Sequence, residues 1–523
     1  MATTILLPLF FLYLTSWHEA AAKDHDNTKN IEWWCSTTPH PHPCTHHMKN
    51  LHPKSHHDFR TMTVSAAMER AAAAKTLARE LSSTADTTSK KMLQLECEYL
   101  IESTILQLNT TLQSITTKAN AAHDAQTWLS AALTSIQTCE SGSRQLSLAA
   151  FSSPILTGNV SEMIRNSLAV NAALLENSTA NDDRRMLRGW LGDGDRKLLQ
   201  DYVWASRANV TVSKDGSGLF KSIQEAINYA TANRPGKKRV IVYVKKGVYE
   251  ENILINRTMT KVMLVGDGVR NTIITANRSS SAGFTTYSTA TFGVDGNGFI
   301  ARGITFRNTA GAENGQAVAL RSASDLSVFY ACSFEGYQDT LFAQAQRQLY
   351  KSCYIYGTVD IIFGNAAVVI QNSVIYARKP LVGQANIITA QGRGDPYQNT
   401  GISIHNCRIL AAPDLKPAVD SFRTYLGRPW QEYSRTVVMK SYLDGLVDPE
   451  GWSKWGDSDF ALDTLYYGEY QNFGPAASTE NRVNWTGYHD INSTDEAAQF
   501  TVANLIFGRQ WLPATGVPFT VGL

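Results

Sequence analysis

An excess of charge of one sign is absent from this 523-residue sequence. Lysine and arginine total 48 and aspartate and glutamate total 46, so the formal net charge is only +2. Nucleic-acid binding normally requires a concentrated basic face that neutralises phosphates. The composition therefore argues against a nucleic-acid partner, while the length and the 43% hydrophobic content allow at least two domains with a large core.

Long apolar runs are also nearly absent. The run from Ile5 to Leu14, followed by small residues, is typical of a secretory signal peptide over residues 1–22, with an uncleaved membrane anchor as the alternative. No later stretch approaches the length of a membrane span, so we expect a secreted protein with no stable membrane association in its mature form. Eight Asn-X-Ser/Thr triplets that can accept glycan agree with export: Asn109, Asn159, Asn177, Asn209, Asn256, Asn277, Asn484 and Asn492.

Cysteine is scarce, and its seven residues fall into an early group of four and a late group of three. In an oxidising compartment the even group predicts two disulfides. The short separation between Cys35 and Cys44 favours that pair, which leaves Cys97 to pair with Cys139.

The late group has an odd number of thiols. Cys332 precedes Asp339 by the same offset that separates Cys353 from Asp360, so a fold that superposes the aspartates also superposes these cysteines. We therefore predict a Cys332–Cys353 disulfide and an unpaired Cys407.

A framework for metal binding is missing. Histidines are crowded into one Pro-interrupted stretch, but no matching cysteine or carboxylate pattern accompanies them, and an exposed polar loop is the better interpretation. We predict no metal and no cofactor. The histidines are His40, His42, His46, His47, His52, His56 and His57.

Glycine and proline are rare from about Val64 to Leu175. This region is rich in Ala, Leu, Thr, Ser, Gln and Glu, with apolar residues at helical spacing, most clearly in MLQLECEYLIESTILQLNTTLQSI. The pattern predicts an all-α antiparallel four-helix bundle, which we place at residues 30–181. Nothing in it resembles a catalytic constellation.

A charged, Gly-interrupted linker follows at residues 182–200. It carries two dibasic sites, Arg184-Arg185-Met186-Leu187 and Arg196-Lys197-Leu198-Leu199. Dibasic pairs at an exposed domain junction favour cleavage by a processing protease, although an ordinary solvated linker is the alternative.

After the linker, short β-branched and aromatic runs alternate with Gly, Asn and Asp, as in RVIVYVKKGVY and QLYKSCYIYG. Such runs are typical of strands. Apolar triplets recur at steps of about one solenoid coil, which predicts an all-β right-handed parallel β-helix over residues 207–516. A β-sandwich is the competing fold, but the scarcity of Asn-Gly hairpin turns argues against it.

Two aspartates, Asp339 and Asp360, stand in matching segments of these repeats. Residues one coil apart lie at strand spacing, about 4.8 Å, so the two carboxyl groups are expected to be neighbours. Two carboxyl groups that close do not both ionise easily, and the pair can supply one acid and one nucleophile. A turn-capping role is the alternative for either aspartate alone.

Other side chains suit a reaction that builds negative charge near this pair. The amides of Gln316 and Gln338 can donate hydrogen bonds to an oxyanion. Arg428, in YLGRPW, can orient a carboxylate through its planar fork, and Trp430 offers a flat face for a sugar ring.

The segment from Asn209 to the C-terminus resembles the plant pectin methylesterases (pectinesterases). The resemblance is carried by DGSGLFKSIQEAI, GFIARGITFRNTAG, GQAVALR, GYQDTLF, GTVDIIFGNAAVVIQ, YLGRPWQEYSRTV and FALDTLYYGEYQN. The first part is similar to the inhibitor-like pro-domain of the same family. Together they resemble a pro-enzyme of the extracellular cell wall, or apoplast, that demethylates pectin.

The resemblance implies a role for each matching residue. Asp360 attacks the methyl ester and forms an acyl-enzyme, while Asp339 acts as acid and then as base. Gln316 and Gln338 stabilise the oxyanion, and Arg428 holds Asp360. Pectin is bound by Thr286, Gln316, Arg428 and Trp430, no metal is required, and the pro-domain is expected to inhibit the enzyme intramolecularly.

Four positions depart from the family pattern. Gly315 stands where histidine is usual, Ile361 where phenylalanine is usual, and Phe342 and His40 where tyrosine is usual. The proposed catalytic residues are intact. The departures motivate a rival hypothesis, a catalytically silent pectin-binding or inhibitory wall protein, and methanol release separates the two; a lyase or glycan hydrolase would instead cut the chain.

Overall fold

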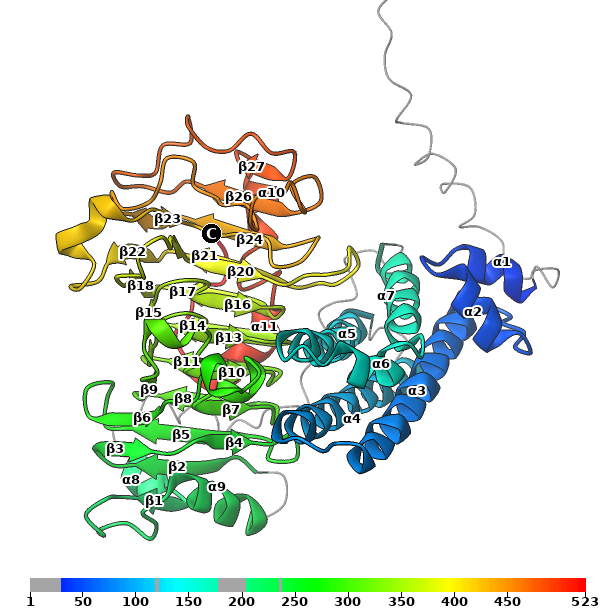
Figure 1. The fold of residues 1–523 in the computed structure, drawn as a ribbon, viewed down its shortest axis with the longest axis horizontal. Helices are drawn as coiled ribbons and strands as arrows, with labels where there is room; N and C mark the ends of the chain where they lie inside the picture. Colours follow the sequence, from blue (N-terminus) through cyan, green and yellow to red (C-terminus); the bar gives the residue numbers. More distant parts are fainter. Residues whose placement is uncertain (1–29, 118–121, 177–203, 235–237) are drawn as a thin grey trace, which may run out of the picture.

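The computed structural model describes residues 30–117, 122–176, 204–234 and 238–523. The predicted signal peptide, both dibasic sites and the sequon at Asn177 lie outside the described residues. Figure 1 shows two parts, a helical domain beside a tall stack of strands.

The helical domain is a four-helix bundle preceded by a short helical hairpin. Its long helices α3, α4, α5 and α7 form a ring in which α3 packs on α4 and α7, and α5 packs on the same two helices. Small residues recur at helical spacing on the buried face of α3, which allows close packing of the neighbouring helices. The helices are α1 (Ile31–Ser36), α2 (Pro41–Met48), α3 (His56–Glu80), α4 (Thr88–Thr117), α5 (Ala122–Gln145), α6 (Ala149–Leu156) and α7 (Val160–Glu176).

Two disulfides staple this domain as predicted. Cys35–Cys44 joins α1 to α2, and Cys97–Cys139 joins α4 to α5. Each bridge closes a loop and so lowers the conformational entropy of the unfolded chain.

The second domain is a right-handed parallel β-helix with three long sheets, and every strand pairing in it is parallel. The first sheet holds, in spatial order, β1 (Val210–Val212), β2 (Val240–Val244), β5 (Val262–Gly266), β8 (Ile300–Arg302), β11 (Ser327–Tyr330), β14 (Arg347–Lys351), β17 (Ala367–Gln371), β21 (Gly401–His405), β24 (Arg435–Met439), β26 (Tyr466–Tyr470) and β27 (Tyr488–Asp490).

The other two long sheets complete each coil. One holds β3 (Gly247–Glu250), β6 (Thr272–Ala276), β9 (Thr305–Asn308), β12 (Ser333–Glu335), β15 (Tyr354–Gly357), β18 (Val374–Ala377), β22 (Arg408–Ala411) and β25 (Tyr442–Leu443). The other, which we call the site sheet, holds β4 (Ile253–Ile255), β7 (Phe292–Val294), β10 (Leu320–Ser322), β13 (Leu341–Ala343), β16 (Ile362–Gly364) and β20 (Thr389–Gln391); β19 (Asn386–Ile387) pairs with β23 (Thr424–Tyr425).

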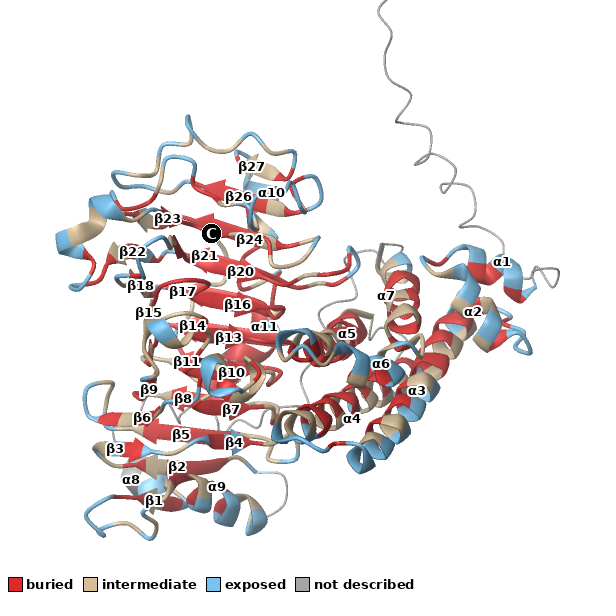
Figure 2. Cartoon of the chain, in the orientation of Figure 1, coloured by how far each residue is buried: buried red, intermediate tan, exposed pale blue. Residues whose placement is uncertain are grey.

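The core runs along the inside of the coils. Aromatic rings stack from coil to coil, with Phe329 on Tyr350 at 4.7 Å and Phe306 on Phe334 at 5.7 Å between centroids. Figure 2 shows that the strands are buried along most of the stack. Short helices flank the strands at both ends of the domain's sequence. They are α8 (Trp204–Arg207) and α9 (Ile223–Ala232) near the first coil, and α10 (Thr494–Ala498) and α11 (Gly508–Trp511) near the C-terminus.

The predicted Cys332–Cys353 disulfide is wrong, because both residues are free buried thiols, as is Cys407. Cys332 and Cys353 do occupy equivalent places in adjacent coils, one residue before the paired strands β12 and β15. Stacked side chains of parallel strands point the same way, whereas a disulfide requires a dihedral angle near 90°. The Sγ atoms instead donate hydrogen bonds to backbone carbonyls, as from Cys353 to Phe329 O at 3.3 Å.

No helix in the described ranges has the length and apolar composition to cross a membrane. The helical domain lies against the β-helix through α4, α5 and α7 (Figure 1). This contact covers the face of the site sheet, with Thr134 on α5 accepting a hydrogen bond from Asn365 at 2.9 Å.

Candidate active site

The two aspartates lie side by side, as predicted. Strand β13 pairs with β16 with Leu341 opposite Ile362, so Asp339 and Asp360, each two residues earlier, occupy equivalent positions in adjacent coils. Both are at a corner with left-handed backbone, with φ of 62° and 51°. Aspartate tolerates this conformation better than most residues, which lets the corner present its carboxyl group outward.

Both aspartates are buried, but their electrostatic environments differ. Asp339 and Asp360 are only 7% and 5% exposed. Desolvation raises the pKa of Asp339 well above its usual range, and the charge of Asp360 raises it further. Desolvation also raises the pKa of Asp360, but Arg428 opposes this shift. The pair therefore favours a protonated Asp339 next to an ionised Asp360.

Arg428 fixes the orientation of the ionised partner. Its Nε and Nη2 donate to the two carboxylate oxygens of Asp360 at 2.8 and 2.7 Å, a bidentate contact. The guanidinium lies over the ring of Trp455, 4.3 Å from its centroid. Sequence reasoning found Arg428 but missed Trp455, whose place in the chain carries no periodic signal.

An open cavity of about 460 Å³ exposes these groups. Both glutamines, Gln316 and Gln338, line it beside the aspartates. Phe342 and Phe363 stack at 4.3 Å on the same wall, and Trp430 meets both rings edge-on. The arrangement combines a carboxylate, a carboxylic acid, amide donors and a flat aromatic face, which suits an acyl transfer on a sugar substrate.

Comparison with known proteins decides the family. A family model described as Pectinesterase matches residues 209–509, more than half of the chain. The chain belongs to the pectinesterase family. A second model, described as Plant invertase/pectin methylesterase inhibitor, matches residues 29–170, which contain most of the helical bundle.

Individual relatives agree with this assignment. "Probable pectinesterase/pectinesterase inhibitor 59" of Arabidopsis thaliana is 52% identical over 95% of this chain and 94% of its own length. "Pectinesterase 2" of Citrus sinensis is 47% identical in an alignment that spans 100% of this chain and 100% of its own length. The solved pectin methylesterase from carrot is 52% identical, with a TM-score of 0.59, over 60% of this chain and 98% of its own.

In this pectinesterase the helical domain forms part of the cavity wall. Glu96 of α4 and Gly142, Arg144 and Gln145 of α5 line the same cavity as the aspartates. The Oε1 of Gln145 accepts a hydrogen bond from the backbone N–H of Thr286 at 2.8 Å. Thr286, the predicted pectin-binding residue, is thus engaged by the helical domain.

Glu96 makes the most deeply buried of these contacts. Its Oε2 accepts hydrogen bonds from the hydroxyls of Thr285 at 2.5 Å and Ser288 at 2.6 Å, while its Oε1 has no partner among the described residues. Desolvation raises its pKa to about 7. Sequence reasoning missed Glu96 and Gln145, because nothing in a helical repeat marks a residue that meets another domain.

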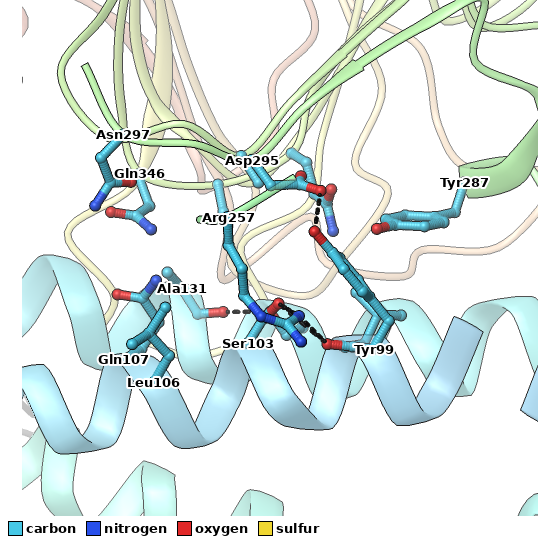
Figure 3. Close-up of a pocket in the computed structure, with 15 residues that line it drawn as sticks. Tyr99, Ser103, Leu106, Gln107, Ala131, Arg257, Tyr287, Asp295, Asn297 and Gln346 are labelled. Atoms are coloured by element: carbon cyan, nitrogen blue, oxygen red, sulfur yellow. Dashed lines mark hydrogen bonds between the residues drawn. The ribbon is translucent and has the colours of Figure 1, made fainter. Parts of the chain in front are cut away.

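A second, smaller cavity of about 40 Å³ lies between α4 and the β-helix. Figure 3 shows Arg257 reaching from the β-helix to α4, where it donates to Tyr99 O at 3.0 Å and to Ser103 at 3.2 Å. Tyr99 in turn donates its hydroxyl to Asp295 at 2.8 Å. Polar contacts therefore continue well beyond the active site.

The histidine stretch and the described glycosylation sequons lie outside the active-site cavity. In the described residues, no group of three or more His, Cys, Asp or Glu is placed to hold a metal ion. The predicted loop is wrong for most of the histidine stretch, because His42, His46 and His47 lie on α2 and His56 and His57 begin α3. Glycan occupancy of the sequons stays a prediction; Asn209, Asn277, Asn484 and Asn492 are exposed, and Asn109, Asn159 and Asn256 are half-buried.

Proposed function

We propose that this pectinesterase removes methyl groups from cell-wall homogalacturonan through an acyl-enzyme on Asp360, releasing methanol and pectate. The observation that carries the proposal is the stacked pair of aspartates with Arg428 clamped on one of them. A carboxylate and a carboxylic acid side by side provide a nucleophile and a proton donor without a cofactor.

The first half-reaction transfers the acyl group to the enzyme. An Oδ atom of Asp360 attacks the C6 carbonyl carbon, and the carbonyl electrons move onto oxygen, where Gln316 and Gln338 donate hydrogen bonds. When the C–O bond to the methoxy group breaks, Asp339 gives its proton to that oxygen and methanol leaves. Asp360 is then joined to the sugar as a mixed anhydride.

The second half-reaction restores the enzyme. Water attacks the C6 carbonyl carbon, and Asp339, now a carboxylate, accepts its proton. The bond from C6 to the Asp360 oxygen breaks, which frees the galacturonate and returns Asp360 to its ionised form. Trp430 and Thr286 are proposed to hold the polysaccharide, with the ring of Trp430 against a sugar.

We further propose that the helical domain inhibits the enzyme within the same chain until a protease cleaves a dibasic site. The support is steric, because Glu96 and Gln145 stand in the cavity wall and Gln145 engages Thr286. Export to the apoplast is proposed from the signal-like N-terminus together with the plant pectinesterases that the chain resembles, since pectin is a cell-wall polymer.

Gly315 and Ile361 motivate the rival hypothesis of a silent wall protein. Ile361 is fully buried and contributes to the core, not to the cavity lining. Isoleucine in place of the usual phenylalanine at position 361 therefore removes no reacting group. The intact geometry of Asp339, Asp360 and Arg428 favours an active enzyme.

A methanol assay on methylated pectin tests the function, with protein that begins near Leu199. We expect this domain to fold alone, because the solved carrot enzyme matches only 60% of this chain although the match spans 98% of the carrot enzyme's own length.

Asp360→Asn should lower kcat by at least about 10⁴-fold while pectin binding persists, since a missing nucleophile removes the covalent route. Asp490→Asn, at an exposed position on β27, is the matched control. Activity of Asp360→Asn equal to the unmodified domain would refute the mechanism, and an inactive unmodified domain would support the silent rival.

A further inference from the structure

Two loops meet beside the active-site cavity. One contains the short helix η4 (Ser280–Ala282) and the other η6 (Ala312–Asn314), which leads into Gln316. The backbone N–H of Ser280 donates to the carbonyl oxygen of Gln316 at 2.9 Å. The backbone N–H of Gln316 donates back to the hydroxyl oxygen of Ser280 at 3.1 Å. These bonds hold the main chains of the two loops together.

The Ser280 hydroxyl makes one more contact that concerns the side chain of Gln316. It donates to Oε1 of Gln316 at 2.7 Å. The amide of glutamine has an acceptor end and a donor end, and an oxyanion is stabilised only by the donor end. Because Ser280 engages the acceptor end, the Nε2 end is directed away from Ser280, and Gln316 lines the cavity that contains Asp339 and Asp360.

The neighbouring glycine leaves room for this contact. Gly315 has φ of 69°, a conformation that favours glycine, and a Cβ atom at this position would lie 2.7 Å from Oγ of Ser280. A larger residue at 315 would therefore displace the hydroxyl. The departure at Gly315, which first cast doubt on activity, is the complement of a serine at 280.

We infer that Ser280 is a positioning residue that sets the amide orientation of Gln316, so that its Nε2 faces the developing oxyanion. This inference deepens the proposed function and rests on the oxyanion role given there to Gln316. It assigns Ser280 no contact with substrate. Because the hydroxyl also accepts a hydrogen bond from the backbone N–H of Gln316 and so helps to hold the two loops together, a purely structural role for it is the competing explanation.

The test compares variants in the domain that begins near Leu199, with pectin as substrate. Ser280→Ala should lower kcat about tenfold, less than the 10²–10³-fold loss typical when an oxyanion donor is removed, because a misoriented amide still samples the productive state. KM should change by less than about twofold, since the interaction is made in the transition state. Ser280→Thr, which keeps the hydroxyl, should recover most of kcat, and Ser281→Ala, at the exposed neighbouring position, should have no effect.

A double-variant cycle separates positioning from structure. In a Gln316→Ala background, Ser280→Ala should cause no further loss of kcat, because the group it orients is gone. An equal loss in both backgrounds would overturn the inference, as would an unchanged kcat or a change confined to KM. The proposed function fails separately, through an active Asp360→Asn variant; an inactive Asp360→Asn with a fully active Ser280→Ala rejects Ser280 alone.

Discussion

Single residues decide the chemistry through their surroundings. Asp339 and Asp360 are the same residue type in the same kind of corner, and their difference comes from Arg428, which contacts Asp360 alone of the two. The proposed mechanism requires Asp360 ionised and Asp339 protonated. Activity should therefore fall as the pH drops through the pKa of Asp360 and as the pH rises through that of Asp339, giving a bell-shaped profile.

Replacing Arg428 by glutamine should move the acid side of this profile. Arg428 opposes the desolvation that raises the pKa of Asp360, so its loss raises that pKa further and shifts the acid limb of kcat/KM to higher pH. We also expect kcat/KM at the optimum to fall by at least about 100-fold, because the nucleophile loses its bidentate orientation.

Profiles of methanol release against pH check this prediction, with Arg428→Lys and Arg408→Gln alongside. Arg428→Lys keeps the charge but loses the fork, so it should move the limb less than glutamine does while still lowering the rate. Arg408 is exposed on β22 and its variant should behave as the unmodified domain. An acid limb that stays in place in Arg428→Gln would contradict the electrostatic role.

Secondary-structure elements place those residues by repetition. Each coil of the β-helix contributes short strands in register with those of the next coil. Leu341 pairs with Ile362, and the two aspartates stack because each stands two residues before one of these partners. The same register was visible in the sequence, where GYQDTLF and GTVDIIF match. It misled the cysteine assignment, because register places Cys332 and Cys353 in neighbouring coils but does not orient their thiols for a bond.

Truncating one ring of the aromatic stack should destabilise several coils together. Phe329 is fully buried and contacts Tyr350, Phe299 and Phe334. Phe329→Ala should lower the free energy of unfolding by about 3–5 kcal/mol through lost contacts and a cavity. Denaturant unfolding measures this, with exposed Phe473→Ala as the control; equal stability of the two variants would contradict a continuous core.

The whole molecule adds the contact between its two domains. Glu96 brings an acidic group from α4 into a buried position against the hydroxyls of Thr285 and Ser288. The positive charge of Arg321 favours the ionised form of this carboxyl group. Desolvation outweighs these partners, so the docked carboxyl is favoured in its neutral form.

Docking of the domains should weaken as the pH rises. The pKa of Glu96 is about 7 in the docked state against an ordinary value of 4.5. Its contribution is therefore fully present below about pH 4.5 and is lost as the pH rises through about 7, a change on the order of 3 kcal/mol. In the full chain, Glu96→Gln should abolish this pH dependence, because glutamine stays neutral.

Hydrogen exchange of the loop around Thr285 in the full chain, followed between pH 4.5 and 8, measures this undocking after correction for intrinsic exchange. Glu80→Gln, at an exposed position at the end of α3, is the control. A Glu96→Gln chain with the same pH dependence as the unmodified chain would show that another group controls docking.

The sequence by itself determined the elements of this protein and its pair of acids, because helical spacing, strand repeats and equal offsets are local patterns that one chain position shares with the next. Only the tertiary structure decided which side chains from distant segments meet: Trp455 under Arg428, Glu96 against Thr285, and Ser280 on Gln316. Such contacts depend on three-dimensional packing between separate elements, and packing leaves no periodic trace in the order of residues.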